Sequence, residues 1–489
     1  MWGAITARAA AEMRRPEVGQ PPWHTQGSTA QPSAALQLPQ HASRQRRSSS
    51  LSDHLAPPRR LSGFSPLQVE AHFARVIQRV MPKSYAQALG EVRVTRTFLE
   101  NFSGDQVRFL ARGFSVPGDH PGQASHGYRW PFGPVAIITP FNFPLEIPAL
   151  QMMGAVYMGN KPLVHSDYRV GLVLDEFVRL LHHCGMGLGE VDVCYGRGHI
   201  INSIIKEAKC RSTLFTGSKR VAEKLAEDLH GRVFLEDAGF DWKILGPDVQ
   251  DFEYVGWQCD QDAYACSGQK CSAQSILFMH DSWAEAGLEK ALAQRASTRK
   301  LDDLTLGPVL TWTTEQMLAH KDRLLGIPGA RLLFGGEALQ GHRIPKQYGA
   351  IQPTAVFVPL REMLKQEHFE AVTTELFGPF QVVTRYGEDE LPLVLEACER
   401  MEAHLTAAVV SNDIRFTQRV LGATVNGTTY AGMRARTTGA PQNHWFGPAG
   451  DPRAAGIGTP EAIRLVWSSH REIIQDFGPV PEGLQLAQS

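Results

Sequence analysis

The stretch GPVAIITPFNFPLEIPALQMMGAVYMGNKPLVH, residues 133–165, decides the fold because short apolar runs flank a longer apolar segment in it. Val135–Thr139 is a short apolar run closed by a proline, which is typical of a buried strand. Ile147–Met158 is long enough for a helix, and a Gly-Asn pair ends it. Leu163–His165 is a second short apolar run. A strand, a helix and a strand in this order predict a βαβ unit with a buried parallel sheet.

The same alternation continues along the chain on either side of a possible domain boundary. Further helices are expected at Val170–Cys184 and Val221–Leu229, and further strands at Val191–Cys194, Thr213–Phe215 and Val233–Leu235. A second alternating block covers about 247–425. Upstream, Ser84 and Gln87 have the spacing of a helix start. We therefore expect an α/β protein of at least two domains, with ligands at the carboxyl ends of the strands.

Length and composition exclude several classes of protein. The 489 residues are too many for one compact domain, and 20% charged with 43% hydrophobic residues is an ordinary globular mixture. A net charge of −1 provides no basic field for nucleic acid. No run approaches the ~18–20 apolar residues that span a bilayer. Seven cysteines without a CxxC pair argue against a disulfide framework and a zinc site. A large enzyme with a small-molecule substrate, and without a nucleic-acid, membrane or metal partner, is expected.

The first 60 residues differ from the rest of the chain. They contain eight arginines, no lysine and three acidic residues, and they are rich in Ser, Ala, Gln and Pro. Such a segment cannot bury enough apolar surface to fold, and its composition is typical of an organellar transit peptide. We expect residues 1–60 to be a disordered transit peptide for the mitochondrial matrix, processed near RQRRSSS at 44–50. The alternative is a disordered tail that carries no targeting signal.

The strongest chemical signal is Tyr264–Ala273, YACSGQKCSA. A cysteine with Gly-Gln upstream and small residues downstream suits a thiol that a substrate must approach closely. Most cysteines are inert core residues, so this signal decides little by itself. It is joined, in chain order, by TPFNFP at 139–144, FTGS at 215–218, LEDAG at 235–239 and ELFGP at 375–379. Together these segments resemble the aldehyde dehydrogenase superfamily, over residues 131–475.

Within that superfamily the chain is most similar to the plant-type Δ1-pyrroline-5-carboxylate dehydrogenases. The finer resemblance lies in WQCDQDAYACSGQKCSA at 257–273, LEDAGFDWKIL at 235–245 and PQNHWFGPAGDPRAAGIGT at 441–459. It implies a mitochondrial enzyme of proline catabolism that oxidises L-glutamate 5-semialdehyde to L-glutamate with NAD. It also implies a homo-oligomer and a fold of three parts: a Rossmann-like NAD-binding domain, an α/β catalytic domain and a small oligomerisation hairpin.

The resemblance divides the chain after residue 60. The NAD-binding domain is expected at 61–246, with the oligomerisation hairpin at about 115–132. The catalytic domain is expected at 247–425, and residues 426–489 return to the first domain and supply an oligomerisation strand, expected at 471–474.

The resemblance also assigns catalytic roles. Cys271 is the expected nucleophile, whose thiolate adds to the aldehyde carbonyl to give a thiohemiacetal and, after hydride loss, a thioester. The Asn142 side chain and the Cys271 backbone N–H are the expected donors to the oxyanion. Glu236 is expected to activate the water that hydrolyses the thioester, provided that burial raises its pKa.

The NAD site implied by the resemblance lies across the strand ends of the first domain. Its expected residues are Ile138, Thr139, Pro140, His165, Asp167, Gly217, Ser218, Glu375 and Phe377. Glu375 would bind the nicotinamide ribose, with Phe377 beside the ring. His165 stands where the superfamily has a lysine. Asp167 is expected to repel a 2′-phosphate and so to favour NAD over NADP.

Substrate recognition is expected at Ser272, Ala455 and Gly456, which would hold the α-carboxylate. Ala455 stands where related enzymes often have a serine. Three alternatives stay open: a CoA-acylating enzyme, a general aldehyde dehydrogenase, and a truncated, catalytically weak NAD-binding or assembly protein. The last follows from an opening strand pair that the superfamily usually has and this sequence lacks. An assay of NADH formation from pyrroline-5-carboxylate distinguishes this catalytically weak protein from an active dehydrogenase.

Overall fold

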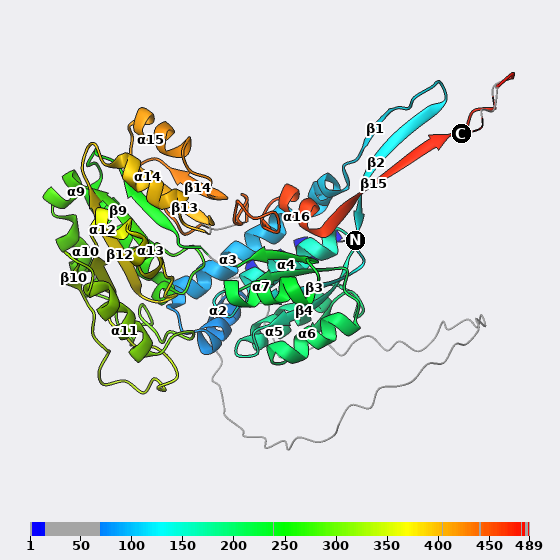
Figure 1. Cartoon of the computed structure of the whole chain (residues 1–489). Coiled ribbons are helices and arrows are strands. Elements are labelled where there is room, and N and C mark those ends of the chain that lie inside the picture. Colours follow the sequence, from blue (N-terminus) through cyan, green and yellow to red (C-terminus); the bar gives the residue numbers. More distant parts are fainter. Residues whose placement is uncertain are drawn as a thin grey trace, which may run out of the picture.

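Two bodies built on parallel sheets and a projecting three-stranded arm make up the chain (Figure 1). The computed structural model describes residues 2–14, 69–237, 239–402, 404–439, 442–480, 482–484 and 488. No helix among these residues is long and apolar enough to cross a membrane.

The first body contains a five-stranded parallel sheet with strand order β5-β4-β3-β6-β7. Its strands are β3 (Pro134–Thr139), β4 (Lys161–Ser166), β5 (Asp192–Cys194), β6 (Ser212–Thr216) and β7 (Val233–Glu236). The connecting helices are α4 (Glu146–Tyr157), α5 (Gly171–His183), α6 (Gly198–Glu207) and α7 (Lys219–Asp228). The chain moves outward from β3 in one direction and then from β6 in the other, so the strand order reverses between β3 and β6. This arrangement confirms the predicted α/β fold with a Rossmann-like sheet.

Alternation along β3 explains why helices cover both faces of this sheet. Val135 and Ile137 are buried in a cluster with residues of α4 and α5. Ala136 lies in a separate cluster with residues of α6 and α7. Successive strand residues point to opposite faces, so a continuously apolar strand needs cover on both. α4 is buried around most of its circumference because further helices pack on its outer side.

The helices that precede the arm pack on the α4 and α5 side. They are α2 (Val69–Val80), α3 (Tyr85–Asn101) and a 3₁₀ segment, η1 (Gly104–Ala111). The Ser84 hydroxyl accepts a hydrogen bond from the Gln87 backbone N–H at 3.3 Å, which confirms the predicted helix start.

Helix α1 (Trp2–Arg14) differs from the expectation that residues 1–60 lie outside the fold. Ile5, Ala9 and Met13 recur every four residues and are buried in the core of the first body. The Thr6 hydroxyl donates to the backbone O of Phe102 at 3.3 Å. An alanine-rich sequence favours helix, and the four-residue spacing creates one apolar face, which the average composition of the segment conceals. The remainder of the expected transit peptide, residues 15–60, lies outside the described residues.

The second body contains a seven-stranded sheet with strand order β10-β11-β12-β9-β8-β13-β14. Only β10 is antiparallel to its neighbour. The strands are β8 (Trp242–Leu245), β9 (Ile276–His280), β10 (Arg331–Phe334), β11 (Thr354–Phe357), β12 (Phe380–Tyr386), β13 (Thr406–Val410) and β14 (Thr428–Ala431). The helices are α8 (Phe252–Tyr264), α9 (Asp281–Glu285), α10 (Leu288–Ala296), α11 (Thr314–Leu325), α12 (Leu360–Met363), α13 (Gln366–Val372), α14 (Leu391–Glu399) and α15 (Ile414–Leu421), with a 3₁₀ segment, η2 (Ala265–Gly268).

Two of these strands lie beyond the expected domain limits. β8 precedes residue 247 and β14 follows residue 425, yet both belong to the seven-stranded sheet. The expected catalytic domain, 247–425, therefore begins after its first strand and ends before its last one. The reason is physical: an apolar run predicts a buried strand but does not indicate which of two parallel sheets will contain it.

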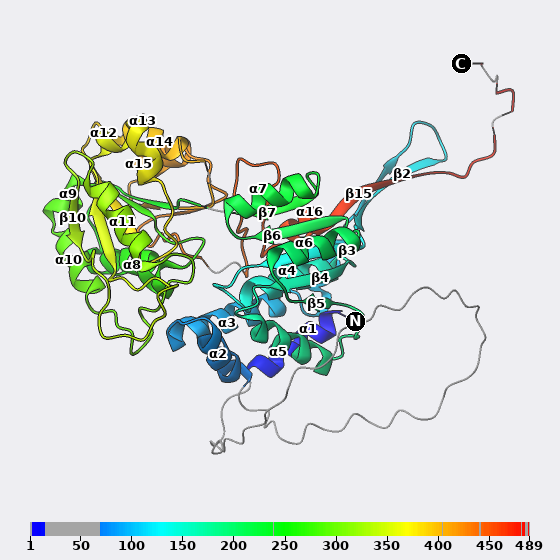
Figure 2. The same ribbon diagram turned by 60° about the horizontal axis from the view of Figure 1, so that its bottom comes forward.

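The arm is an antiparallel sheet of β1 (Phe114–Pro117), β2 (Gln123–Pro131) and β15 (Ser468–Asp476). β15 follows α16 (Pro460–Trp467) and pairs with β2 from Ser468 opposite Pro131 to Asp476 opposite Gln123. Figures 1 and 2 show the arm extending from the first body, away from the second. The expected hairpin and the expected strand at 471–474 are thus present, and their role in assembly stays a prediction.

Candidate active site

The predicted nucleophile follows a strained segment of backbone. Cys266, Ser267 and Gly268, directly after α8, have φ angles of 56°, 56° and 66°. Left-handed backbone costs ~1–3 kcal/mol for a residue other than glycine and persists only where the surroundings hold it. The consecutive left-handed residues turn the chain out of the helix, and Cys271 comes three residues later. Cys271 is partly exposed and packs against the core of the first body.

Side chains of the motif itself fix this loop. The Gln269 side chain donates to the backbone O of Pro308 at 3.0 Å and accepts from the N–H of Leu310 at 2.8 Å. A Cβ on Gly268 would lie 1.9 Å from the backbone O of Gly378, so only glycine allows this approach. Gly268 therefore packs the Cys271 loop against the segment 375–379, and Gln269 joins the same loop to residues 308–310.

Cys271 and Glu236 interact directly, although they come from different bodies. Glu236 ends β7 and is buried. Burial raises the pKa of the Glu236 carboxyl to about 7. Burial and, after it, the negative charge of Glu236 raise the pKa of the Cys271 thiol well above its ordinary value. A neutral thiol thus lies beside a carboxylate that titrates near neutral pH, which is the arrangement required of a general base.

The backbone around Asn142 is held by a buried ion pair that the sequence prediction missed. Lys83 Nζ donates to Glu91 Oε2 at 2.9 Å and to the backbone O of Asn142 at 2.6 Å. Glu91 Oε1 accepts from the N–H groups of Leu145 at 2.8 Å and Glu146 at 3.2 Å. Burial lowers the pKa of Lys83, but Glu91 and the other anionic groups near it raise that pKa overall. The loop between β3 and α4 is consequently fixed at Asn142 and at the two residues, Leu145 and Glu146, that lead into α4.

A signal for part of this arrangement was present in the sequence. Glu91 lies on the same face of α3 as the buried residues Ala88, Val92 and Thr95. A carboxylate on an otherwise apolar face requires a buried partner, because an unpaired charge there is costly. Its partner, Lys83, precedes the helix and carries no such periodic signal.

The strand ends at the reversal between β3 and β6 fit a dinucleotide. Thr139 ends β3, and Gly217 and Ser218 follow β6 and lead into α7. The Ser218 side chain makes no capping bond within α7, so its hydroxyl is not used by the helix. A helix N-terminus at the switch point of a doubly wound sheet is a favourable place for a pyrophosphate. The predicted cofactor residues of the first body are therefore brought to one edge of the sheet.

The predicted preference for NAD over NADP requires an uncompensated negative charge on Asp167, but Asp167 is paired with Arg169. Its carboxylate accepts from Arg169 Nε at 2.9 Å and from Arg169 Nη2 at 2.7 Å. Burial acts to raise the pKa of Asp167, but the bonds from Arg169 lower it overall. Because Arg169 compensates the negative charge, the charge argument for NAD over NADP loses its basis. His165 is neutral near pH 7, since burial lowers its pKa, and its ring Nδ1 lies 3.1 Å from the backbone O of Cys194.

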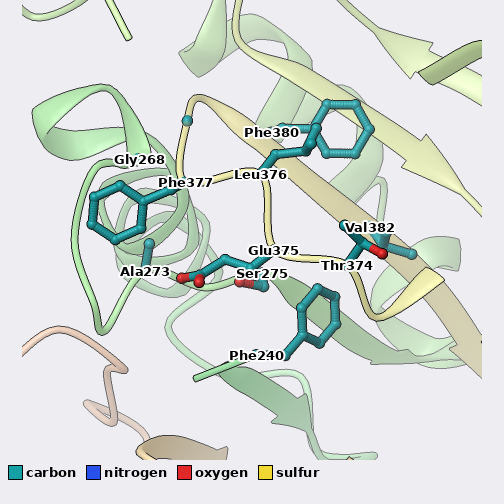
Figure 3. Close-up of a pocket in the computed structure, with 11 residues that line it drawn as sticks. Phe240, Gly268, Ala273, Ser275, Thr374, Glu375, Leu376, Phe377, Phe380 and Val382 are labelled. Atoms are coloured by element: carbon teal, nitrogen blue, oxygen red, sulfur yellow. The ribbon is translucent and has the colours of Figure 1, made fainter. Parts of the chain in front are cut away.

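Glu375 and Phe377 line a cavity behind the nucleophile loop (Figure 3). The Glu375 side chain points toward Ala273, on the side of the cavity that Phe377 also lines. Burial and then Glu236 raise the pKa of Glu375 to about 8. Phe377 has a φ of 39° and packs edge-to-face on Phe141, with 6.1 Å between ring centroids. Both predicted residues thus lie near Cys271, and their contact with a nicotinamide stays a prediction.

A larger cavity of about 180 Å³ lies on the other side of Cys271. A cavity of ~150 Å³ accepts a molecule the size of benzene. The lining residues are Ala86, Gln87, Gly90, Glu91, Val94, Phe143, Glu146, Ile147, Lys270, Cys271, Ser272, Thr438, Gly439 and Phe446. The cavity therefore offers apolar walls, five charged or hydroxyl-bearing side chains besides the thiol, and room for a small substrate.

The expected substrate loop takes a different position. The Ala455 N–H donates to the backbone O of Leu235 at 3.0 Å, alongside β7, so it is not available to a carboxylate. A Cβ on Gly456 would lie 2.5 Å from the Trp445 ring, which shows that the loop packs under that ring. Of the predicted substrate residues, only Ser272 lines the cavity. The backbone donor of Ala455 is therefore used by the sheet edge, and a role for Ala455 and Gly456 in substrate binding stays a prediction.

Comparison with known proteins agrees with the fold. The aldehyde dehydrogenase family matches residues 66–451, and the chain belongs to this family of oxidoreductases. It is 67% identical to the mitochondrial Δ1-pyrroline-5-carboxylate dehydrogenase 12A1 of Arabidopsis thaliana, over 86% of this chain and 76% of that protein. A "Probable aldehyde dehydrogenase" of Linum usitatissimum is 68% identical over 86% and 77%. The crystal structure of an NAD-dependent aldehyde dehydrogenase from Sinorhizobium meliloti has the same fold, with a TM-score of 0.74 at 20% identity, over 85% of this chain and 80% of that one.

Proposed function

We propose that this protein oxidises L-glutamate 5-semialdehyde, the open form of Δ1-pyrroline-5-carboxylate, to L-glutamate with NAD. The observation that carries the proposal is the direct interaction of Cys271 with a titratable Glu236 beside a cavity containing buried charges. The 67% identity to the Arabidopsis enzyme supports this choice of substrate. That relative is named mitochondrial, and we place this chain in the mitochondrial matrix on the same ground.

The first chemical step is addition of the thiol to the aldehyde. The Cys271 proton passes to Glu236 as the sulfur bonds to the carbonyl carbon, and the carbonyl oxygen becomes an oxyanion. The Asn142 side-chain amide and the Cys271 backbone N–H donate to that oxygen. Lys83 and Glu91 hold the Asn142 backbone, so the donor is in place before charge develops.

Hydrolysis of the thioester follows. Loss of hydride from the thiohemiacetal carbon leaves a thioester on Cys271. Glu236 first releases the proton taken from Cys271 to solvent, and its carboxylate then takes a proton from water as the water oxygen bonds to the thioester carbon. The carbon–sulfur bond breaks, and the thiolate recovers a proton from Glu236, which restores the starting state. One oxygen of the Glu236 carboxylate is buried and has no hydrogen-bond partner among the described residues, so it is available to a water molecule.

NAD, when bound, supplies the hydride acceptor. Thr139, Gly217 and Ser218 would hold it in the first body, and Glu375 and Phe377 would face its nicotinamide end from the second. NAD rather than NADP is proposed from the family relationship alone, since Arg169 compensates the charge of Asp167.

The test is NADH formation by the purified full chain with pyrroline-5-carboxylate. We expect robust turnover for the wild type, and for Cys271→Ala less than about 1% of it, since removal of a nucleophile leaves only residual catalysis. The variant should keep the melting temperature of the parent, because the thiol is small and partly exposed. No turnover by the wild type would favour the alternative of a catalytically weak NAD-binding or assembly protein. Substantial activity of Cys271→Ala would refute the assignment of the nucleophile.

A further inference from the structure

Two ionisable side chains in the cavity beside Cys271 have no directly bonded partner among the described residues. Glu146 is 6% exposed and Lys270 is 9% exposed, and both line the cavity. Neither makes a hydrogen bond or an ion pair through its charged group with any other residue that the structure describes. Burying an unpaired charge is costly, so each group requires an explanation.

The other buried lysines of the described chain are paired. Lys83 Nζ lies 2.9 Å from Glu91, and Lys243 Nζ lies 2.7 Å from Asp262. Lys270 differs from both, although it is buried in the same way. Among the described residues, the fold therefore pairs its other buried lysines directly and leaves Lys270, next to the nucleophile, without a direct ion pair.

Glu146 is equally unusual for its element. It begins α4, whose other buried residues are apolar apart from Gln151. Its backbone N–H donates to Glu91, which fixes the start of the helix and hence the position of the side chain. Burial and then Glu91 raise the pKa of Glu146 to about 8, while Lys83 and Lys270 act in the opposite direction. The carboxylate would gain most from a cation brought into the cavity.

We propose that this cavity recognises the substrate as a zwitterion, with Glu146 binding the α-ammonium group and Lys270, together with the Ser272 hydroxyl, binding the α-carboxylate. The inference rests on the proposed function and adds the specificity-determining residues. The substrate's ammonium and carboxylate groups lose water when they enter the cavity, and charge-assisted hydrogen bonds to the protein compensate for that loss. The same bonds give Glu146 and Lys270 directly bonded partners. An analogue that lacks one group leaves one protein charge stranded, and such a site rejects it strongly.

A purely structural role predicts a different pattern. If Glu146 and Lys270 only balanced each other across the cavity, neutralising either one would affect all substrates alike. If they bind separate groups, each substitution should change the preference for only one group. The two explanations can therefore be separated with substrates that differ by a single group.

The experiment measures kcat/KM of the full chain for three aldehydes of related length. These are glutamate semialdehyde, 5-oxopentanoate, which lacks the amino group, and 4-aminobutanal, which lacks the carboxylate. Glu146→Gln should lower the preference for glutamate semialdehyde over 5-oxopentanoate by ~10-fold or more, as expected for a lost charged hydrogen bond. Lys270→Met should lower the preference over 4-aminobutanal by a similar ~10-fold. Each variant should leave the other ratio largely in place.

Glu285→Gln on exposed α9 is the matched control for the loss of a carboxylate and should shift neither ratio. A second readout is the rise in melting temperature caused by L-glutamate, which Glu146→Gln should diminish. Equal shifts of both ratios in either variant, or no shift in a variant that still turns over, would overturn the zwitterion site. If the wild type fails to oxidise pyrroline-5-carboxylate at all, the proposed function fails first, so the two failures are distinguishable.

Discussion

At the scale of single residues, Glu236 makes the sharpest prediction. The thiol of Cys271 can also lose its proton to solvent, whereas thioester hydrolysis depends on water activation by Glu236, so Glu236→Gln should give a burst of NADH followed by slow turnover. Rapid mixing followed by steady-state absorbance measures both phases. A variant without the burst would show that Glu236 also serves the first step as an indispensable base.

The same residue predicts the pH dependence. The pKa of Glu236 is raised to about 7 by burial, and only the ionised carboxylate accepts a proton from water. Thioester hydrolysis should therefore rise with pH through about 7 and level off above it. The inflection should vanish in Glu236→Gln, and its persistence there would assign it to another group.

Sequence reasoning recovered the residues that carry a local motif and missed those that act through packing. Cys271, Glu236 and Glu375 come together as predicted, because each belongs to a short ordered segment. Glu146 and Lys83 could not be predicted, because their meaning depends on what surrounds them after folding. The bond from the Ala455 N–H to β7 could not be predicted for the same reason, because the two segments are remote in sequence.

At the scale of elements, α1 tests whether the first residues belong to the fold. Met13 is fully buried in the first body, so Met13→Ala in the full chain should lower the free energy of unfolding by ~2–4 kcal/mol. Ala7→Ser, on the exposed side of the same helix, should change it by less than ~0.7 kcal/mol, the spread of helix propensities. Urea unfolding of both variants provides the comparison. Equal stability of Met13→Ala and its parent would mean that α1 does not dock in solution.

The β3–α4–β4 unit could be predicted almost to its ends, because its apolar runs are long and uninterrupted. Expected strand 135–139 is observed as 134–139, and expected helix 147–158 as 146–157. β8 shows the limit of this reasoning. Its buried Lys243 is paired with Asp262 of α8, so the strand is placed by an ion pair that no local pattern indicates.

At the scale of the whole molecule, the arm is the expected means of assembly, and we propose that the protein is a homo-oligomer. β15 is the outer strand of the arm and offers a free edge with exposed Ile474 nearby, as a strand that pairs across subunits would. A chain ending at Trp467, without β15, should elute from a sizing column as a smaller species than the full chain. Elution of both as the same oligomer would place the subunit contact elsewhere.

The candidate active site is also a property of the whole molecule, because Asn142 and Glu236 come from the first body and Cys271 and Glu375 from the second. We propose that this composite site is specific for a charged amino-acid semialdehyde. The most direct measurement is the ratio of kcat/KM for glutamate semialdehyde to that for propanal, with NAD and the full chain. We predict a ratio of at least ~10², about 2.7 kcal/mol of transition-state stabilisation. Comparable kcat/KM values for the two aldehydes would contradict the proposed specificity and identify a general aldehyde dehydrogenase.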